Sequence, residues 1–142
     1  MTRSVLIMGL PGAGKTTLAT ELIKLLESRG KSVTWFNADE IRKKFDDWDF
    51  SETGRIRQAQ RMRDLADEAN TDYVIADFVA PLPEMRDIFA ADVTIWMATL
   101  RAGRFENTNR AFIPPTSYDI QVTFQDAKFW ALKIDRYLLL GF

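Results

Sequence analysis

The chain has 142 residues, of which 46% are hydrophobic, and a formal net charge of -1 at pH 7. This length and apolar content predict one compact domain over residues 1–142, and the near-zero charge argues against a stable nucleic-acid partner or an anionic membrane surface. The chain contains no cysteine and no histidine, which excludes disulfides, thiolate metal sites and a histidine general base. Because it shows no leader-like segment and no apolar run of the ~20 residues needed to span a bilayer, we expect a cytoplasmic protein.

Short apolar runs alternate along the chain with stretches whose apolar residues recur at helical spacing. Strands are predicted at 4–9, 31–37, 72–78, 92–97 and 119–124, and helices at 15–29, 39–45, 53–70, 84–90 and 126–139. Gly30 is expected to end the first helix. In the last helix, core packing is predicted for Phe129, Trp130, Ile134 and Leu138. The alternation predicts an α/β fold of three layers, in which helices cover both faces of a five-stranded parallel sheet and ligands bind at the carboxyl ends of the strands.

The turn between the first strand and the first helix, GLPGAGKTT at residues 9–17, fits the phosphate-binding pattern G-x-x-x-x-G-K-[ST]. Glycines let backbone N–H groups approach phosphate oxygens, and the helix that follows adds the positive end of its dipole. Lys15 is expected to neutralise the β- and γ-phosphates of ATP, and the hydroxyl of Thr16 to bind Mg²⁺. The residues predicted to hold ATP in this P-loop are Gly9, Pro11, Gly12, Ala13, Gly14, Lys15, Thr16 and Thr17. The alternative is a glycine-rich turn that binds nothing, which the strand, helix, lysine and threonine together disfavour.

Two acidic residues follow the next two predicted strands. Asp39 comes just after the second strand and Asp77 ends the apolar run of the third, so both are expected to face the P-loop and to hold magnesium or its water shell. Lys15, Asp39 and Asp77 are therefore the candidate catalytic residues, and Thr16, Asp39 and Asp77 the candidate metal ligands. The alternatives are a helix N-cap for Asp39 and a solvated loop acid for Asp77.

Proteins with a P-loop divide into small-molecule kinases, GTPase switches and motor ATPases. A GTPase usually needs a longer chain and a base-recognising motif of the N-K-x-D type, and this sequence contains no such motif. The sequence therefore favours an ATP-dependent kinase with a P-loop NTPase fold of the nucleotide-kinase type. A nucleotide-dependent switch protein with negligible phosphoryl transfer is the alternative from a different class.

Four segments carry a resemblance to a known family. GLPGAGKTTLATEL, NADEIR, DFSETGRIRQAQRM and VIADFVAPLPEMR resemble, in order and spacing, the adenylylsulfate kinase motifs G-L-S-G-S-G-K-S-T, D-G-D-N-x-R, G-F-S-x-x-x-R-x-x-N and a strand ending in S-F-I-S-P, over about residues 4–90. The resemblance implies that MgATP phosphorylates the 3′-hydroxyl of adenosine 5′-phosphosulfate (APS). The partner would be a small nucleotide. The alternative is a kinase of another nucleotide-like acceptor, such as a hydroxymethylated pyrimidine. The sequence does not decide whether the protein is a monomer or a homodimer.

The resemblance also implies roles for single residues on the acceptor side. Asp39 would orient or deprotonate the hydroxyl, Phe50 would stack on adenine, and Arg55 would bind the anionic end. The full set of implied acceptor residues is Arg42, Phe50, Arg55, Gln58, Phe78 and Val79. Ordinary core packing is the alternative for Phe50, and a solvated helix face is the prediction for Arg57 and Arg63.

The sequence departs from the family motifs at several positions. Asn37 replaces the first acid of D-G-D-N, and Asp77 stands where the family often has serine. These two differences predict that the carboxylate that binds magnesium lies toward the third strand instead of the second. Gln58 stands where the family has asparagine. The lid-like segment at about 99–118 is short, and its candidate phosphate-binding cations are Arg101, Arg104 and Arg110, with Gly103 as a hinge. A polar connection to the last strand is the alternative for this segment.

Overall fold

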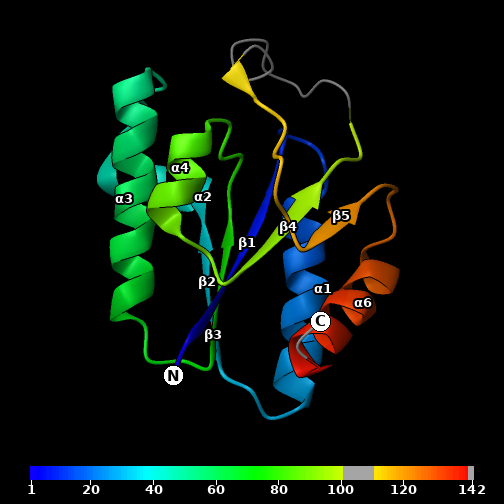
Figure 1. Ribbon diagram of the computed structural model, residues 1–142. Coiled ribbons are helices and arrows are strands. Elements are labelled where there is room, and N and C mark those ends of the chain that lie inside the picture. Colours follow the sequence, from blue (N-terminus) through cyan, green and yellow to red (C-terminus); the bar gives the residue numbers. More distant parts are fainter. Residues whose placement is uncertain (101–110, 141–142) are drawn as a thin grey trace.

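The computed structural model describes residues 1–100 and 111–140 and contains one five-stranded sheet (Figure 1). The strands are β1 (Arg3–Gly9), β2 (Val33–Asn37), β3 (Tyr73–Asp77), β4 (Val93–Met97) and β5 (Ile120–Val122). The helices are α1 (Lys15–Ser28), α2 (Ala38–Phe45), α3 (Glu52–Glu68), α4 (Pro83–Phe89) and α6 (Ala127–Leu140). Every strand pair is parallel and the order is β2-β3-β1-β4-β5, so the predicted fold class is confirmed.

Four of the five strands are shorter than the sequence predicts, and the second and fifth show the physical reason. The second strand begins at Val33 rather than at residue 31, because the backbone N–H of Lys31 donates to the Leu26 carbonyl and so belongs to the end of α1. The fifth strand covers only Ile120–Val122, at the edge of the sheet, where a single neighbour supplies backbone partners. Gly30 lies just past α1 with φ of 78°, as its predicted role at the helix end requires.

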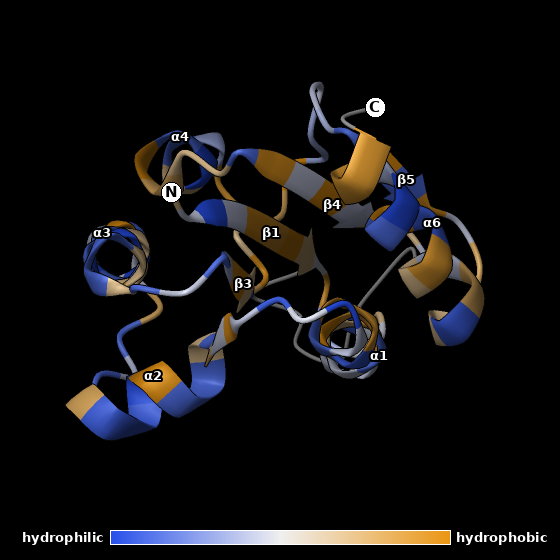
Figure 2. Cartoon of the chain, turned by 90° about the horizontal axis from the view of Figure 1, so that it is seen from below, coloured by the Kyte–Doolittle hydropathy of each residue, from blue (hydrophilic) through white to orange (hydrophobic). Residues whose placement is uncertain are grey.

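Helices cover both faces of the sheet, and Figure 2 shows α3 and α4 on one side of the strands and α1 and α6 on the other. Side chains of β1 alternate between two buried cores, with Val5 and Ile7 in the core beneath α1 and α6 and Leu6 and Met8 in the core beneath α3 and α4. A parallel strand that is buried on both faces needs such a continuous apolar run. The central strand therefore holds its carboxyl end, where the P-loop begins, in a rigid position.

The last helix only partly matches the predicted core face. Ile134 and Leu138 are buried, but Phe129 is 40% exposed and packs at the surface on Phe124 and Trp130, with ring centroids 5.5 and 5.2 Å away. The prediction was wrong for Phe129 because it lies two residues before Ala131 and so on the opposite side of α6 from the buried Ala131, Ile134 and Leu138. Within residues 1–100 and 111–140, none of the helices combines the length and the apolarity that crossing a membrane would need.

Candidate active site

The P-loop joins β1 to α1 at the carboxyl end of the sheet. Gly14 is the N-cap of α1, with φ of 99° and no side-chain cap, so the first N–H groups of the helix face the loop instead of a capping side chain. Open N–H groups at a helix N-terminus form an anion site. The loop presents Gly9, Pro11, Gly12, Ala13 and Gly14, and the first turn of α1 presents Lys15, Thr16 and Thr17.

The ammonium group of Lys15 lies over this loop. Its Nζ donates to the carbonyl oxygens of Gly9 at 2.9 Å and Leu10 at 3.0 Å. These bonds hold the positive charge at the mouth of the anion site. An incoming phosphate therefore meets a cation that is already in place.

Asp77 ends β3 in a buried position, with 2% of its surface exposed. Its carboxylate accepts a hydrogen bond from the indole Nε1 of Trp35 at 2.8 Å and one from Nδ2 of Asn37 at 2.9 Å. Burial raises the pKa of Asp77, whereas these two hydrogen bonds and the charge of Lys15 lower it. The alternative of a solvated loop acid is therefore wrong, because Asp77 is an enclosed and oriented carboxylate.

Asn37 links this carboxylate to the P-loop and to α2. It is the cross-strand register partner of Asp77, and its Nδ2 also lies 3.5 Å from the hydroxyl of Thr16. Its Oδ1 accepts from the backbone N–H of Glu40 at 3.1 Å, which makes Asn37 the N-cap of α2. The predicted alternative of an N-cap at Asp39 is thus wrong, and Asp39 is an exposed residue of the first helical turn whose charge raises the pKa of Asp77.

The oxygen atoms gathered here suit Mg²⁺. Thr16 offers a hydroxyl and Asp77 a carboxylate, and among the described residues there is no group of three or more acidic, histidine or cysteine side chains that would form an all-protein metal cage. Magnesium usually binds through one or two carboxylates together with substrate phosphates. The donor set therefore fits a metal that arrives with a nucleotide.

A second part of the site lies between the segment that joins α2 to α3, the start of α3 and the segment that follows β3. A cavity of about 570 Å³ is lined by Trp48, Phe50, Ser51, Glu52, Arg55, Leu82 and Ala111. Phe50 is 50% exposed, which excludes core packing for its ring. Leu82 follows β3, so this cavity opens at the same edge of the sheet as the P-loop.

Two buried arginines lie against the ring of Phe50. The guanidinium carbon of Arg42 is 4.4 Å from the ring centroid and that of Arg55 is 5.9 Å away. Burial lowers the pKa of both guanidinium groups, but arginine keeps its charge in proteins. An aromatic face beside guanidinium donors can bind a flat base and an oxyanion together.

Of the predicted acceptor residues, Phe50 and Arg55 line the cavity, whereas Arg42 and the other three do not. Phe78 is 3% exposed and packs edge to face on Phe89 at 5.7 Å, so it belongs to the core because β3 is still covered by α4 at that point. Gln58 is 1% exposed and donates from Nε2 to the Ala38 carbonyl at 3.1 Å, which ties α3 to α2. Val79 is half-buried beyond the end of β3.

Sequence reasoning missed several polar residues of this region. The sequence pattern indicates Trp35 only as part of a strand, although its spacing of two from Asn37 places both side chains on one face of β2. Arg57 is exposed, as predicted, but its guanidinium is paired with Asp47 and Asp49. Arg63 is only partly exposed and donates to the Phe89 carbonyl. The lid candidates Arg101, Arg104 and Arg110, with Gly103, lie outside the described residues.

A smaller cavity of about 160 Å³ adjoins the P-loop on the side of α6. Its lining includes Gly14, Thr17, Met97, Phe124 and Trp130. These side chains provide an apolar surface within reach of the helix N-terminus at Gly14. The cavity is a candidate for the base of the bound nucleotide.

Comparisons with known proteins agree with this geometry. The family model described as adenylylsulphate kinase matches residues 1–99. A curated relative, the probable adenylyl-sulfate kinase of Aeropyrum pernix, is 34% identical over 87 residues, which are 59% of this chain and 48% of the relative. The match thus spans about half the length of that relative.

Solved structures share the fold along nearly the whole chain. An APS kinase of Mycobacterium tuberculosis in complex with AMPPNP and APS superposes with a TM-score of 0.82 at 17% identity, covering 97% of this chain and 98% of that one. A shikimate kinase of Acinetobacter baumannii in complex with shikimate superposes with a TM-score of 0.65 at 18% identity, covering 99% and 94%. The fold is therefore one on which kinases of different acceptors are built.

Proposed function

Because the chain belongs to the adenylylsulfate kinase family, we propose that it transfers the γ-phosphoryl group of ATP to the 3′-hydroxyl of APS. The observation that carries this proposal is the cavity in which the ring of Phe50 and the guanidinium of Arg55 face one space at the P-loop edge of the sheet. Adenine suits the ring and the phosphosulfate suits the guanidinium. The complex of the Mycobacterium tuberculosis relative with AMPPNP and APS supports the same pair of ligands.

On the nucleotide side, the P-loop N–H groups and Lys15 would bind the β- and γ-phosphates. The hydroxyl of Thr16 and the carboxylate of Asp77 would hold Mg²⁺, and the metal would supply charge neutralisation on the phosphate oxygens. Trp35 and Asn37 keep the Asp77 carboxylate turned toward this position. The arginines Arg101 and Arg104 of the lid-like segment are proposed as further phosphate ligands.

On the acceptor side, Asp39 would orient the 3′-hydroxyl and accept its proton as the new O–P bond forms and ADP leaves. Its position in the first turn of α2, from which its charge raises the pKa of Asp77, supports this role. Arg42 and Arg55 would hold the anionic end of the acceptor and thereby fix the distance between the hydroxyl and the γ-phosphate.

A coupled assay of ADP release with MgATP and a panel of acceptors tests the proposal. We expect APS to accelerate ADP formation and to yield 3′-phosphoadenylyl sulfate, and the Lys15→Ala variant to be inactive with every acceptor. Shikimate and a hydroxymethylated pyrimidine nucleotide are the comparison acceptors. Stimulation by one of them and not by APS would reject the substrate and keep the kinase, whereas slow hydrolysis that no acceptor changes would favour a switch protein.

A further inference from the structure

Residues 46–51 join α2 to α3 and carry Phe50 and Trp48, two of the residues that line the larger cavity; we call this segment the acceptor loop. Its backbone is bound to the two buried arginines. Arg42 donates from Nη1 to the carbonyls of Asp47 at 2.9 Å and Asp49 at 3.3 Å, and Arg55 donates from Nε to the Phe50 carbonyl at 2.8 Å. The guanidinium groups and the loop are thus held in position by one another.

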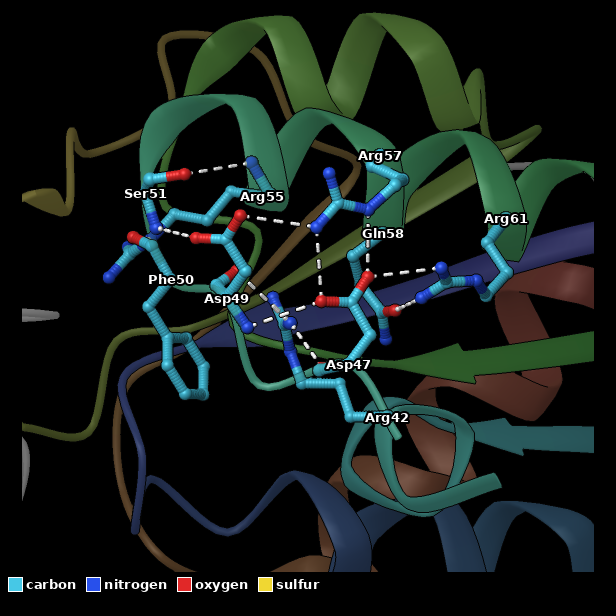
Figure 3. Close-up of polar contacts among 10 residues, drawn as sticks. Arg42, Asp47, Asp49, Phe50, Ser51, Arg55, Arg57, Gln58 and Arg61 are labelled. Carbon is cyan, nitrogen blue, oxygen red and sulfur yellow. Dashed lines mark hydrogen bonds and ion pairs between the residues drawn. The ribbon is translucent and has the colours of Figure 1, made fainter. Parts of the chain in front are cut away.

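The acidic side chains of the same loop bind in turn to the arginines of α3 (Figure 3). The Asp47 carboxylate accepts from Nε and Nη2 of Arg57 at 2.8 and 3.1 Å and from Nη2 of Arg61 at 3.0 Å. Asp49 accepts from Nη2 of Arg57 at 3.2 Å and from the Ser51 N–H at 2.9 Å. Arg57 therefore binds both carboxylates that flank Trp48. Arg61, one helical turn further along α3, binds the first of them.

Close packing places the loop directly on the first turn of α3. A Cβ atom at Gly54 would lie 2.2 Å from the Asp49 carbonyl oxygen, so only glycine admits the loop at this distance. Asp49 itself stands where the G-F-S-x-x-x-R-x-x-N motif has glycine, and its carboxylate is one of the two that Arg57 binds. One acid of the ion-pair network therefore stands at a position where the family motif has glycine.

From these contacts we propose that Arg57, with Arg61, is a positioning residue that fixes the acceptor loop on α3, so that Phe50, Arg42 and Arg55 are in place before the acceptor arrives. The inference rests on the proposed function for the identity of the acceptor. Arg57 does not line the cavity, so it acts through the loop and not by touching the acceptor. Because its side chain is 45% exposed, its ion pairs stabilise the fold only modestly, and their larger effect is to preorganise the binding site.

Steady-state kinetics of three variants test this role. We expect Arg57→Gln to raise the Michaelis constant for APS by about tenfold and to leave that for ATP unchanged, because the P-loop has no contact with the network. Arg57→Lys keeps the charge but loses the two-pronged contact, so it should recover only part of the effect. Gln60→Ala, a change at an exposed position of the same helix, is the matched control and should equal wild type. A wild-type constant for APS in Arg57→Gln, or full recovery with Arg57→Lys, would overturn the inference.

Amide hydrogen exchange without any acceptor gives a second and independent reading. In Arg57→Gln, the amides of residues 47–51 should exchange faster than in wild type, while those of β1 and β3 should not change. If wild type does not use APS, the proposed function fails, and this measurement still decides the inference. Equal protection of residues 47–51 in both proteins would show that Arg57 does not hold the loop.

Discussion

At the scale of single residues, the Asp77 carboxylate depends on donors that come from another strand. Trp35 and Asn37 both lie on β2 and each donates one hydrogen bond to it. A hydrogen bond to a charged group is worth about 1.5–3 kcal/mol, and its loss leaves a buried oxygen without a partner. Orientation of the proposed metal ligand therefore rests on an indole that no phosphate-binding motif contains.

Replacing that indole gives the first prediction. Trp35→Phe removes the donor and keeps an aromatic ring, so we expect the Mg²⁺ concentration for half-maximal ADP formation to rise by about fivefold with little change in maximal rate. A calorimetric titration of AMPPNP at several magnesium concentrations should show the same shift in binding. Trp96→Phe, at a residue of β4 that packs on Tyr118, is the control and should leave both curves unchanged. An unaltered magnesium dependence of Trp35→Phe would remove the orienting role.

At the scale of elements, the contact between the acceptor loop and α3 has a dependence on pH. Hydrogen bonding to Arg57 is the first cause that lowers the pKa of Asp47 below its usual range, and Arg61 and the backbone of Asp49 act in the same direction. A carboxylate with a depressed pKa in the folded state stabilises the fold above its unfolded pKa of about 3.9 and loses this effect as the pH falls.

Urea unfolding between pH 7 and pH 3 tests this linkage. The urea concentration at the midpoint of unfolding should decrease for wild type once the pH drops below about 4. The decrease should be smaller for Asp47→Asn, because this variant has no charge to lose at position 47. Asp49 also has a lowered pKa through Ser51 and Arg57, so part of the slope should persist in the variant. Parallel curves for the two proteins would contradict the assigned pKa shift.

Elements were also the level at which the sequence was most informative. Apolar alternation located all five strands and all five described helices, because burial on both faces of a parallel sheet leaves a continuous apolar run that local patterns reveal. The Trp35 to Asp77 bond joins positions 42 residues apart, and no local pattern encodes it. The pairing of Arg57 is hidden for a related reason: a helical pattern places an arginine on a polar face but does not reveal whether a neighbouring loop supplies carboxylates.

At the scale of the whole molecule, a nucleotide that binds the folded P-loop must stabilise the fold. A ligand at 100 times its Kd adds about 2.7 kcal/mol, which for a domain of this size corresponds to a rise in Tm of about 5–10 °C. We expect MgAMPPNP to produce such a rise in wild type and none in Lys15→Ala, while the two proteins without nucleotide melt together because Lys15 is not part of either core. Differential scanning calorimetry of both proteins, with and without MgAMPPNP, measures these shifts in Tm. An equal rise in the variant would reject the P-loop as the nucleotide site.

The order of strands sets when the nucleotide site can exist during synthesis. The strand that leads into the P-loop pairs with β3 and β4, and Val5 aligns with Ile75 on one side and Val93 on the other. Until β3 at Tyr73–Asp77 has been synthesised, β1 has neither of its two neighbours. A nascent or prematurely terminated chain that stops before β4 therefore carries the complete GLPGAGKTT segment and yet lacks the scaffold that would let it retain ATP.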